Sequence, residues 1–184
     1  MQLGLKDLHY AKVTKNGEQR TYGSPAVMAK AIKVDLSTNM AEASLYADDT
    51  LAFNAKSFVD GKISLNVDDL TNEVIADLLG LEVDRDGVVY AGNEDEENAP
   101  IVALGFASKK SGGKYRYLWI YEVQFSLPPE SYETKGEQIK IITPTIEGKI
   151  FKRPDGRWKA DYVGLPTSTV AQNWFNSVRE FQAE

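Results

Sequence analysis

Strand-like patterns dominate the chain. Five segments are rich in β-branched and aromatic residues and are bounded by Gly, Pro, Asn or Asp, which is typical of β-strands. They cover residues 25–36, 58–68, 100–109, 114–126 and 139–151. A short polar loop at 109–113 ends in two glycines, which can take positive φ at little steric cost. Residues 100–126 therefore predict a β-hairpin.

The second arm of that hairpin has the clearest two-sided pattern. Alternate positions place Tyr115, Tyr117, Trp119, Tyr121, Val123 and Phe125 on one face, and Arg116, Leu118, Ile120, Glu122 and Gln124 on the other. The first face is apolar throughout, so we expect it to pack on a core. The second face is mixed, so we expect it to be half-buried against a helix or another subunit. An exposed aromatic platform for carbohydrate is the alternative, although strictly alternating aromatics more often belong to a core.

One short segment has helical periodicity near the middle of the chain. Within residues 72–79, the apolar residues fall at helical spacing and share one face. Thr71 or Asp69 can cap the start of this helix, and Gly80 stands where a C-terminal capping glycine is common.

A second helix is predicted over residues 169–182. Its apolar stripe consists of Val170, Trp174, Val178 and Phe181, and Ser168 is the candidate N-cap. A stripe of this kind usually docks a terminal helix on the protein's own sheet, so we expect Trp174 and Phe175 to belong mainly to the core. Docking on a partner is the alternative.

Two stretches read as loops that are long for a β domain, at residues 37–57 and 127–138. Long excursions from a small domain are usually functional arms. The sequence has no internal repeat, low-complexity tract or Pro/Ser linker. We therefore expect a single domain over residues 1–184, mainly β with a few helices (α+β), with long loops at these two places.

Composition excludes much of enzyme chemistry. The chain of 184 residues has no cysteine, which excludes thiolate nucleophiles and Cys-ligated metals, and His9 is its one histidine. No G-x-S-x-G motif, P-loop or G-x-G-x-x-G follows a predicted strand. The acidic runs at 94–97 and 48–49 lack the alternating spacing of a calcium loop. We expect no enzymatic activity, no cofactor and no metal site, and a structural or surface role for His9.

The charge is negative and uneven. There are 27 acidic and 21 basic residues, a net charge of −6, which argues against a surface that grips nucleic acid through its phosphates. Residues 1–99 hold 18 acidic and 9 basic residues, whereas residues 100–184 hold 9 and 12. The start of the chain lacks the pattern of a signal peptide, and no stretch reaches the roughly 18–20 apolar residues of a membrane span. We expect a soluble protein.

Eight short blocks occur in a recognisable order. They are GLKDLHYA at 4–11, TYG at 21–23, SLYADD at 44–49, ALGF at 103–106, GKYRY at 113–117, YETKG at 132–136, PTIEG at 144–148 and NWFNSV at 173–178. This collinear series resembles the major tail proteins, or tail-tube proteins, of long-tailed phages and prophages of Gram-positive bacteria. The match runs from about residue 3 to about residue 178, nearly the whole chain.

The resemblance implies a structural virion protein without catalysis. Such subunits stack as hexameric rings into the tube through which phage DNA leaves the capsid. They are built on a β-sandwich or barrel with a flanking helix, to which the predicted C-terminal helix would be added. The implied partners are other copies of the chain and the tape-measure, tail-terminator and distal-tail proteins, while DNA passes through the lumen without specific binding. The implied location is the virion tail, after assembly in the cytoplasm of the host bacterium.

The candidate functional residues fall into three groups. For an inter-subunit arm they are Leu45, Tyr46, Asp48, Asp49, Leu51 and Phe53; for the core strand, Tyr115, Tyr117, Trp119, Tyr121 and Phe125; and for docking of the C-terminal helix, Val170, Trp174, Phe175, Val178 and Phe181. A non-catalytic carbohydrate-binding β-sandwich is the alternative. A glycosidase using two carboxylates is a distant third, because 27 acids always provide some pair at a suitable distance.

Overall fold

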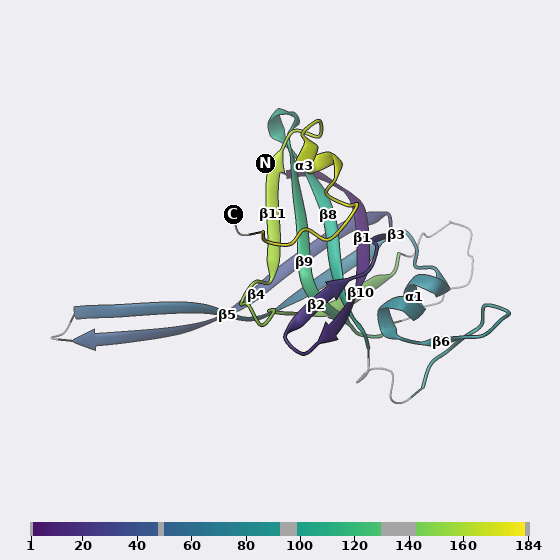
Figure 1. Ribbon diagram of the computed structural model, residues 1–184, viewed down its shortest axis with the longest axis horizontal. Helices are drawn as coiled ribbons and strands as arrows, with labels where there is room; N and C mark the ends of the chain where they lie inside the picture. Colours follow the sequence, from purple (N-terminus) through teal and green to yellow (C-terminus); the bar gives the residue numbers. More distant parts are fainter. Residues whose placement is uncertain (1, 48–49, 93–98, 130–142, 183–184) are drawn as a thin grey trace, which may run out of the picture.

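Antiparallel strands make up most of the fold in the computed structural model (Figure 1), which describes residues 2–47, 50–92, 99–129 and 143–182. The nine strands of the main sheet are β1 (Gln2–Asn16), β2 (Gln19–Tyr22), β3 (Ala26–Ala29), β4 (Ala31–Ala47), β5 (Thr50–Val67), β8 (Ile101–Lys110), β9 (Tyr115–Phe125), β10 (Thr145–Phe151) and β11 (Lys159–Gly164). β6 (Glu82–Val83) pairs with β7 (Val89–Tyr90) and, in the part of the chain that the structure describes, with no other strand. The helices are α1 (Asn72–Leu79), the 3₁₀ turn η1 (Ser111–Gly113) and α3 (Thr169–Gln172). The predicted mainly-β fold is confirmed.

The main sheet curls back on itself into a barrel. Its strands follow the order β2-β1-β8-β9-β10-β5-β4, and β3, which runs on into β4 through Lys30, pairs with β1. Apolar side chains fill the interior, and Ile63, Leu65, Val102, Leu104, Ile120 and Ile150 are among those that are fully buried. The predicted strand at 25–36 is therefore divided at Lys30 into two strands with different partners.

Helix α1 packs on the barrel core and has the bounds that the sequence predicts. Thr71 is the N-cap, since its Oγ1 accepts a hydrogen bond from the backbone N–H of Val74 at 3.4 Å. Gly80 ends the helix at φ 73°, in the left-handed region that glycine adopts without strain. The buried residues of the helix, among them Leu78 and Leu79, join the barrel core.

The predicted hairpin is confirmed as β8 and β9, joined by η1, but β9 contains a β-bulge. Val102 lies opposite Val123, whereas Leu104 lies opposite Ile120, so β9 has one extra residue between these pairs. The extra residue reverses the alternation of the side chains that follow it. Val123 and Phe125 therefore join Leu118 and Ile120 in the barrel core.

The predicted division of β9 into two faces is wrong beyond the bulge. Tyr117, Trp119 and Tyr121 face a second cluster of buried side chains outside the barrel, while Val123 and Phe125 face the barrel interior. We call this cluster, which also contains Ala103, Ala107, Trp174 and Val178, the second core. The second face is also more deeply buried than predicted, because Leu118 and Ile120 belong to the barrel core rather than to a half-covered surface.

The segment after α3 covers the second core as an irregular strap, which we define as residues 173–182. The predicted helix at 169–182 is wrong beyond its first turn, although Ser168 caps that turn by accepting from the N–H of Ala171 at 3.3 Å. Trp119 Nε1 donates to the carbonyl of Trp174 at 2.9 Å, and Tyr121 Oη donates to that of Arg179 at 2.8 Å. The first of these bonds occupies the carbonyl that a helix over 169–182 would pair with the N–H of Val178.

The strap buries only part of the predicted stripe. Trp174 is 3% exposed and Val178 is also buried, whereas Phe175 is partly buried. Val170 and Phe181 are exposed, Phe181 to 65%. The predicted docking surface is thus corrected to Trp174, Phe175 and Val178.

The two predicted loops have different outcomes. Residues 37–57 are not a loop: apart from 48–49, which lie outside the described residues, they belong to the strands β4 and β5. Most of the second loop, residues 130–138, also lies outside them, as do residues 139–142 of the last predicted strand, and 127–129 have no regular structure.

Candidate assembly interface

The strands β4 and β5 extend well beyond the barrel as a two-stranded hairpin (Figure 1). β10 pairs with β5 only over Gly61–Asn66, whereas β4 and β5 pair with each other from Ala31 and Val67 to Ala47 and Thr50. We call residues 39–60 the arm. Within the described residues, the arm has no strand partner on either of its two outer edges.

The arm is largely exposed to solvent. Of its described side chains, only Phe58 and Asp60 are partly buried. A two-stranded hairpin with no further sheet or helix against it is marginally stable in water. Exposed strand edges also invite pairing with other chains. The arm therefore has the features of a surface that another protein covers.

The structure places four of the six predicted arm residues in the outer part of the arm. Leu45 lies opposite Phe53 and Tyr46 opposite Leu51, with a register shift between Leu45 and Tyr46. The two others, Asp48 and Asp49, lie outside the described residues. The sequence thus predicts where the chain projects from the domain, but it predicts a loop where the structure has two paired strands.

The root of the arm is fixed to the barrel. Phe58 stacks on Trp158 of the β10–β11 connection, with ring centroids 4.7 Å apart and planes 3° from parallel. Asp60 accepts a hydrogen bond from Asn39 at 2.6 Å and forms an ion pair with Lys149 at 3.1 Å. These two donors lower the pKa of the Asp60 carboxyl. The arm therefore leaves the barrel in a defined direction.

The two faces of the arm differ. Glu42 and Lys56 lie opposite each other and form an ion pair at 3.2 Å. The positions that face the other way, Ala41, Ala43, Ala55 and Ser57, carry small side chains. One face can therefore approach another surface closely, while the other carries charge.

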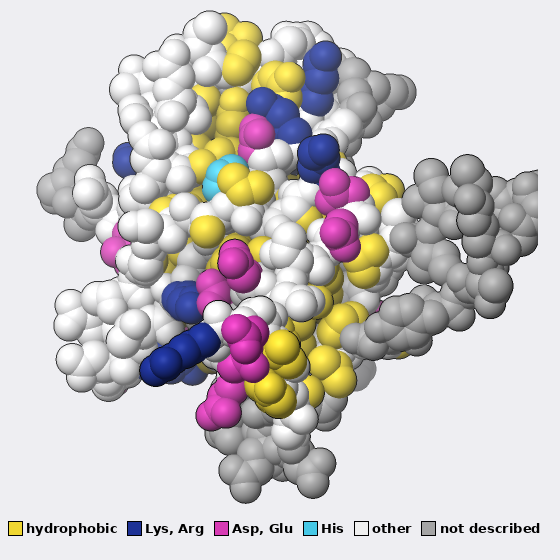
Figure 2. All heavy atoms as spheres, turned by 90° about the vertical axis from the view of Figure 1, so that its right-hand side faces the viewer, with side chains coloured by type: hydrophobic (Ala, Val, Ile, Leu, Met, Phe, Trp, Pro, Cys, Tyr) yellow, Lys and Arg dark blue, Asp and Glu magenta, His cyan; other side chains and the backbone are white. Residues whose placement is uncertain are grey.

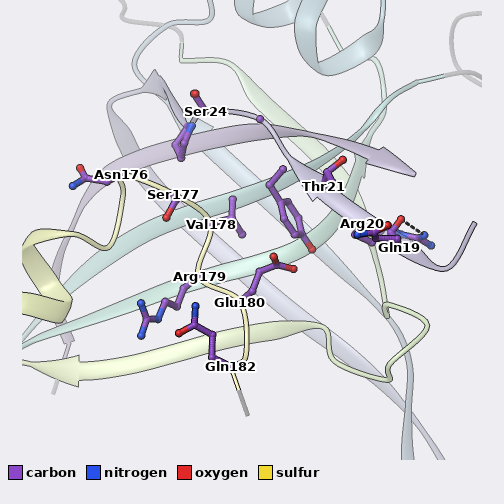
Figure 3. Close-up of a pocket in the computed structure, with 13 residues that line it drawn as sticks. Gln19, Arg20, Thr21, Ser24, Asn176, Ser177, Val178, Arg179, Glu180 and Gln182 are labelled. Carbon is purple, nitrogen blue, oxygen red and sulfur yellow. Dashed lines mark hydrogen bonds between the residues drawn. The ribbon is translucent and has the colours of Figure 1, made fainter. Parts of the chain in front are cut away.

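A cavity of about 540 Å³ lies between residues 19–25 and the strap (Figure 3). Its wall is mostly polar, with Thr21 and Ser24 on one side and Asn176, Ser177 and Gln182 on the other. Small-molecule sites are usually lined by apolar and aromatic side chains with few polar groups. The composition of the wall thus gives little support to a small-molecule site.

A charged and aromatic cluster borders this cavity, and its members Arg20 and Glu180 help to line the cavity wall. Glu122 of β9 is 3% exposed, and Arg20 of β2 donates to it through Nε at 2.6 Å. The guanidinium of Arg153 lies 5.0 Å from the ring of Tyr121 and donates to Glu180 of the strap at 3.0 Å. The cluster joins β2, β9 and the strap through paired charges, so its role is structural.

The sequence pattern does not predict this cluster. It predicts Glu122 on a mixed, half-buried face, whereas the bulge turns the side chain toward Arg20. A carboxylate inside a strongly apolar strand is itself a signal that a basic partner lies near, because a buried charge is rarely left unpaired. Burial also raises the pKa of Tyr121 beside it.

The predicted aromatic strand is a core element. Tyr117, Trp119, Tyr121 and Phe125 are buried, and Tyr115 is partly buried. Carbohydrate could not stack on the buried rings, so the exposed-platform interpretation of this strand is wrong. His9 stacks on Phe175 with centroids 4.6 Å apart, which agrees with a structural role.

The described part of the chain contains no group of three or more His, Cys, Asp or Glu residues placed to hold a metal ion. The acidic run at 94–97 lies outside it. None of the helices in the described ranges combines the length and apolar character needed to cross a bilayer. No protein-family model matches the chain, and no curated protein shows significant similarity to it.

Proposed function

We propose that this protein is a self-assembling structural subunit, the tail-tube protein of a long-tailed phage or prophage. The ordered series of sequence blocks from 4–11 to 173–178 supports the family. The exposed arm is the observation that carries the proposal, because it is a long ordered element that the protein's own barrel does not cover. In a tube, neighbouring copies cover it.

The shape of the molecule suits head-to-tail assembly. The arm and helix α1 lie toward opposite ends of the long axis (Figure 1). Rings and stacked rings are built from heterologous contacts, in which each subunit presents two different complementary surfaces. A projecting element at one end and a separate surface at the other meet this requirement.

The proposed role is passive transport of DNA, in stacked hexameric rings. A conduit for a polyanion works best when its surface does not bind phosphate strongly, and the net charge of −6 agrees with this. Under this proposal the protein acts without catalysis or a cofactor.

Shortening the arm tests the proposal. Replacing residues 42–56 by Asn-Gly retains the pairs Ala41–Ser57 and Met40–Phe58, and Asn-Gly suits a two-residue hairpin turn. The stack of Phe58 on Trp158 is also retained. We expect the variant to unfold at the same urea concentration as the full chain but to remain monomeric, while the full chain forms rings or tubes by negative-stain microscopy. Normal tubes from the shortened variant would contradict the role of the arm.

A further inference from the structure

The small hairpin β6–β7 exposes apolar side chains at the end of the molecule away from the arm. It pairs with no other strand among the described residues. Val83, Val88 and Tyr90 are between 45% and 56% exposed. Asp84 holds the turn: its carboxylate accepts from the N–H groups of Asp86 and Val88 and from Tyr90 Oη, each at 2.9 Å. The hairpin is thus an ordered apolar projection.

The chain around this hairpin is strongly acidic. Residues 68–86 contain seven acidic residues and one basic residue, Arg85. Asp77 pairs with Lys12 at 2.6 Å and accepts from Tyr10, and the other six acids are exposed. Figure 2, which faces this side of the molecule, shows acidic side chains beside exposed hydrophobic ones. We call residues 68–90 the acidic end.

The root of the arm is rich in basic residues. Residues 149–159 contain five basic residues and one acidic residue, Asp155. Four of the five pair with an acid of the same subunit, and Lys152 forms none of the ion pairs among the described residues: the pairs are Lys149–Asp60, Arg153–Glu180, Arg157–Asp155 and Lys159–Asp161. The Phe58–Trp158 stack and the Lys149–Asp60 ion pair hold this segment against the arm. Lys149, Lys152 and Arg157 are exposed, and so are the apolar side chains of Met40 and Val59 in the arm itself. We call residues 149–159 the basic root.

We propose that the acidic end of one copy docks on the basic root of the next. The inference rests on the proposed self-assembly and names the two surfaces that meet. The acidic end exposes apolar side chains of its own, and the arm, which the basic root contacts, exposes Met40 and Val59. The acidic end lies away from the arm, whereas the basic root lies where the arm leaves the barrel (Figure 1). Complementary charge steers association and fixes register, while buried apolar area supplies affinity.

Two exposed residues suit a charge-reversal test. Glu82 on β6 and Lys152 after β10 are both exposed, so reversing their charge should leave the fold intact. Either Glu82→Lys or Lys152→Glu places like charges across the proposed contact. The double variant places opposite charges there again. Lys114→Glu is the matched control, since Lys114 is exposed in the β8–β9 turn, outside both surfaces.

The readout is the protein concentration at half-assembly, followed by light scattering. We expect each single reversal to raise this concentration about 5-fold, which corresponds to a loss near 1 kcal/mol per contact. Added salt should raise the half-assembly concentration of the wild type, because it screens the charges. The double variant should recover most of this loss, and the control should match the wild type.

The possible failures are distinguishable. If the wild type assembles and both single reversals behave like the control, this pairing of surfaces is wrong while self-assembly stands. The same conclusion follows if the double variant has a half-assembly concentration as high as those of the single reversals. If the wild type remains monomeric at every concentration, the proposed function fails as well. Retention of the wild type by double-stranded DNA that Lys152→Glu abolishes without any change in assembly would assign the basic root to nucleic acid instead.

Discussion

Replacing Trp174 with alanine tests whether the strap belongs to the core of the subunit. The side chain is 3% exposed and lies between Tyr117 and Tyr162, with ring centroids 6.1 Å and 5.9 Å away. Its Nε1 donates to the carbonyl of Leu118 at 3.4 Å. The carbonyl of Trp174 accepts from Trp119, and alanine retains that acceptor. The substitution therefore removes packing and one long hydrogen bond, and it leaves the bond from Trp119 to the strap in place.

The expected loss of unfolding free energy is large. A buried Trp→Ala change costs about 3–5 kcal/mol, which includes the cavity and aromatic contacts of about 0.5–1.5 kcal/mol each. For a domain of this size, about 2–4 °C per kcal/mol converts this into a fall in melting temperature of roughly 6–20 °C. Trp174→Phe keeps most of the apolar volume and loses one long hydrogen bond, so it should cost about 1–2 kcal/mol.

Urea denaturation followed by far-UV circular dichroism, with the protein below its assembly concentration, measures this loss directly. A Trp174→Ala subunit whose unfolding free energy stays within about 1 kcal/mol of the wild type would show that the strap is not part of the core. If that stable variant also failed to form tubes, the strap would be an assembly surface rather than part of the core.

Two other predictions concern the sheet. Gly105→Ala would place a Cβ 2.7 Å from Cζ3 of Trp119, which is fully buried. We therefore expect the unfolding free energy measured by urea denaturation to fall by about 1–3 kcal/mol. An unchanged midpoint would contradict this close packing. Arg116 donates to Asp161 and lowers the pKa of that carboxyl below its ordinary value of 3.8. The ion pair therefore stabilises the fold above pH 3.8, and this stabilisation is lost as the pH falls through the lower pKa of the folded state. The unfolding free energy of Asp161→Asn should therefore fall less steeply in acid than that of the wild type. If the two plots of unfolding free energy against pH were parallel, the pair would not stabilise the fold.

The parts of the fold that depend on local sequence were predictable. Helix α1 has its cap residues and apolar spacing within ten residues of chain, and both match the structure. The β8–β9 hairpin is likewise encoded by two adjacent apolar runs and a glycine turn. Local patterns suffice where the partners of a segment are its neighbours in the chain.

The arm shows why its form was not predictable. Residues 37–57 are rich in Ala, Ser, Asn and Asp, which have little intrinsic preference for strands. Their strand conformation comes from the long register between β4 and β5. The length of the segment without apolar alternation did indicate an excursion from the domain, and that part of the prediction agrees with the structure.

The bulge in β9 depends on contacts between distant segments. β9 pairs with β11 up to Ile120 and with β10 from Glu122 onward. The extra residue lies where the partner strand changes, and it turns Glu122 toward Arg20. The apolar pattern of β9 alone contains no information about its change of partner from β11 to β10. The strap also depends on distant partners, since Trp119 and Tyr121 of β9 donate to two of its carbonyls.

Under the proposed function, copies of this chain cover each other's exposed arms. Sedimentation velocity of the purified full chain over a range of concentrations, with negative-stain images of the fastest fraction, measures this self-association. We expect the monomer to give way to rings or tubes of uniform width as the concentration rises. A single monomeric species throughout that range, with no regular particles on the grid, would show that the arms are not covered by other copies.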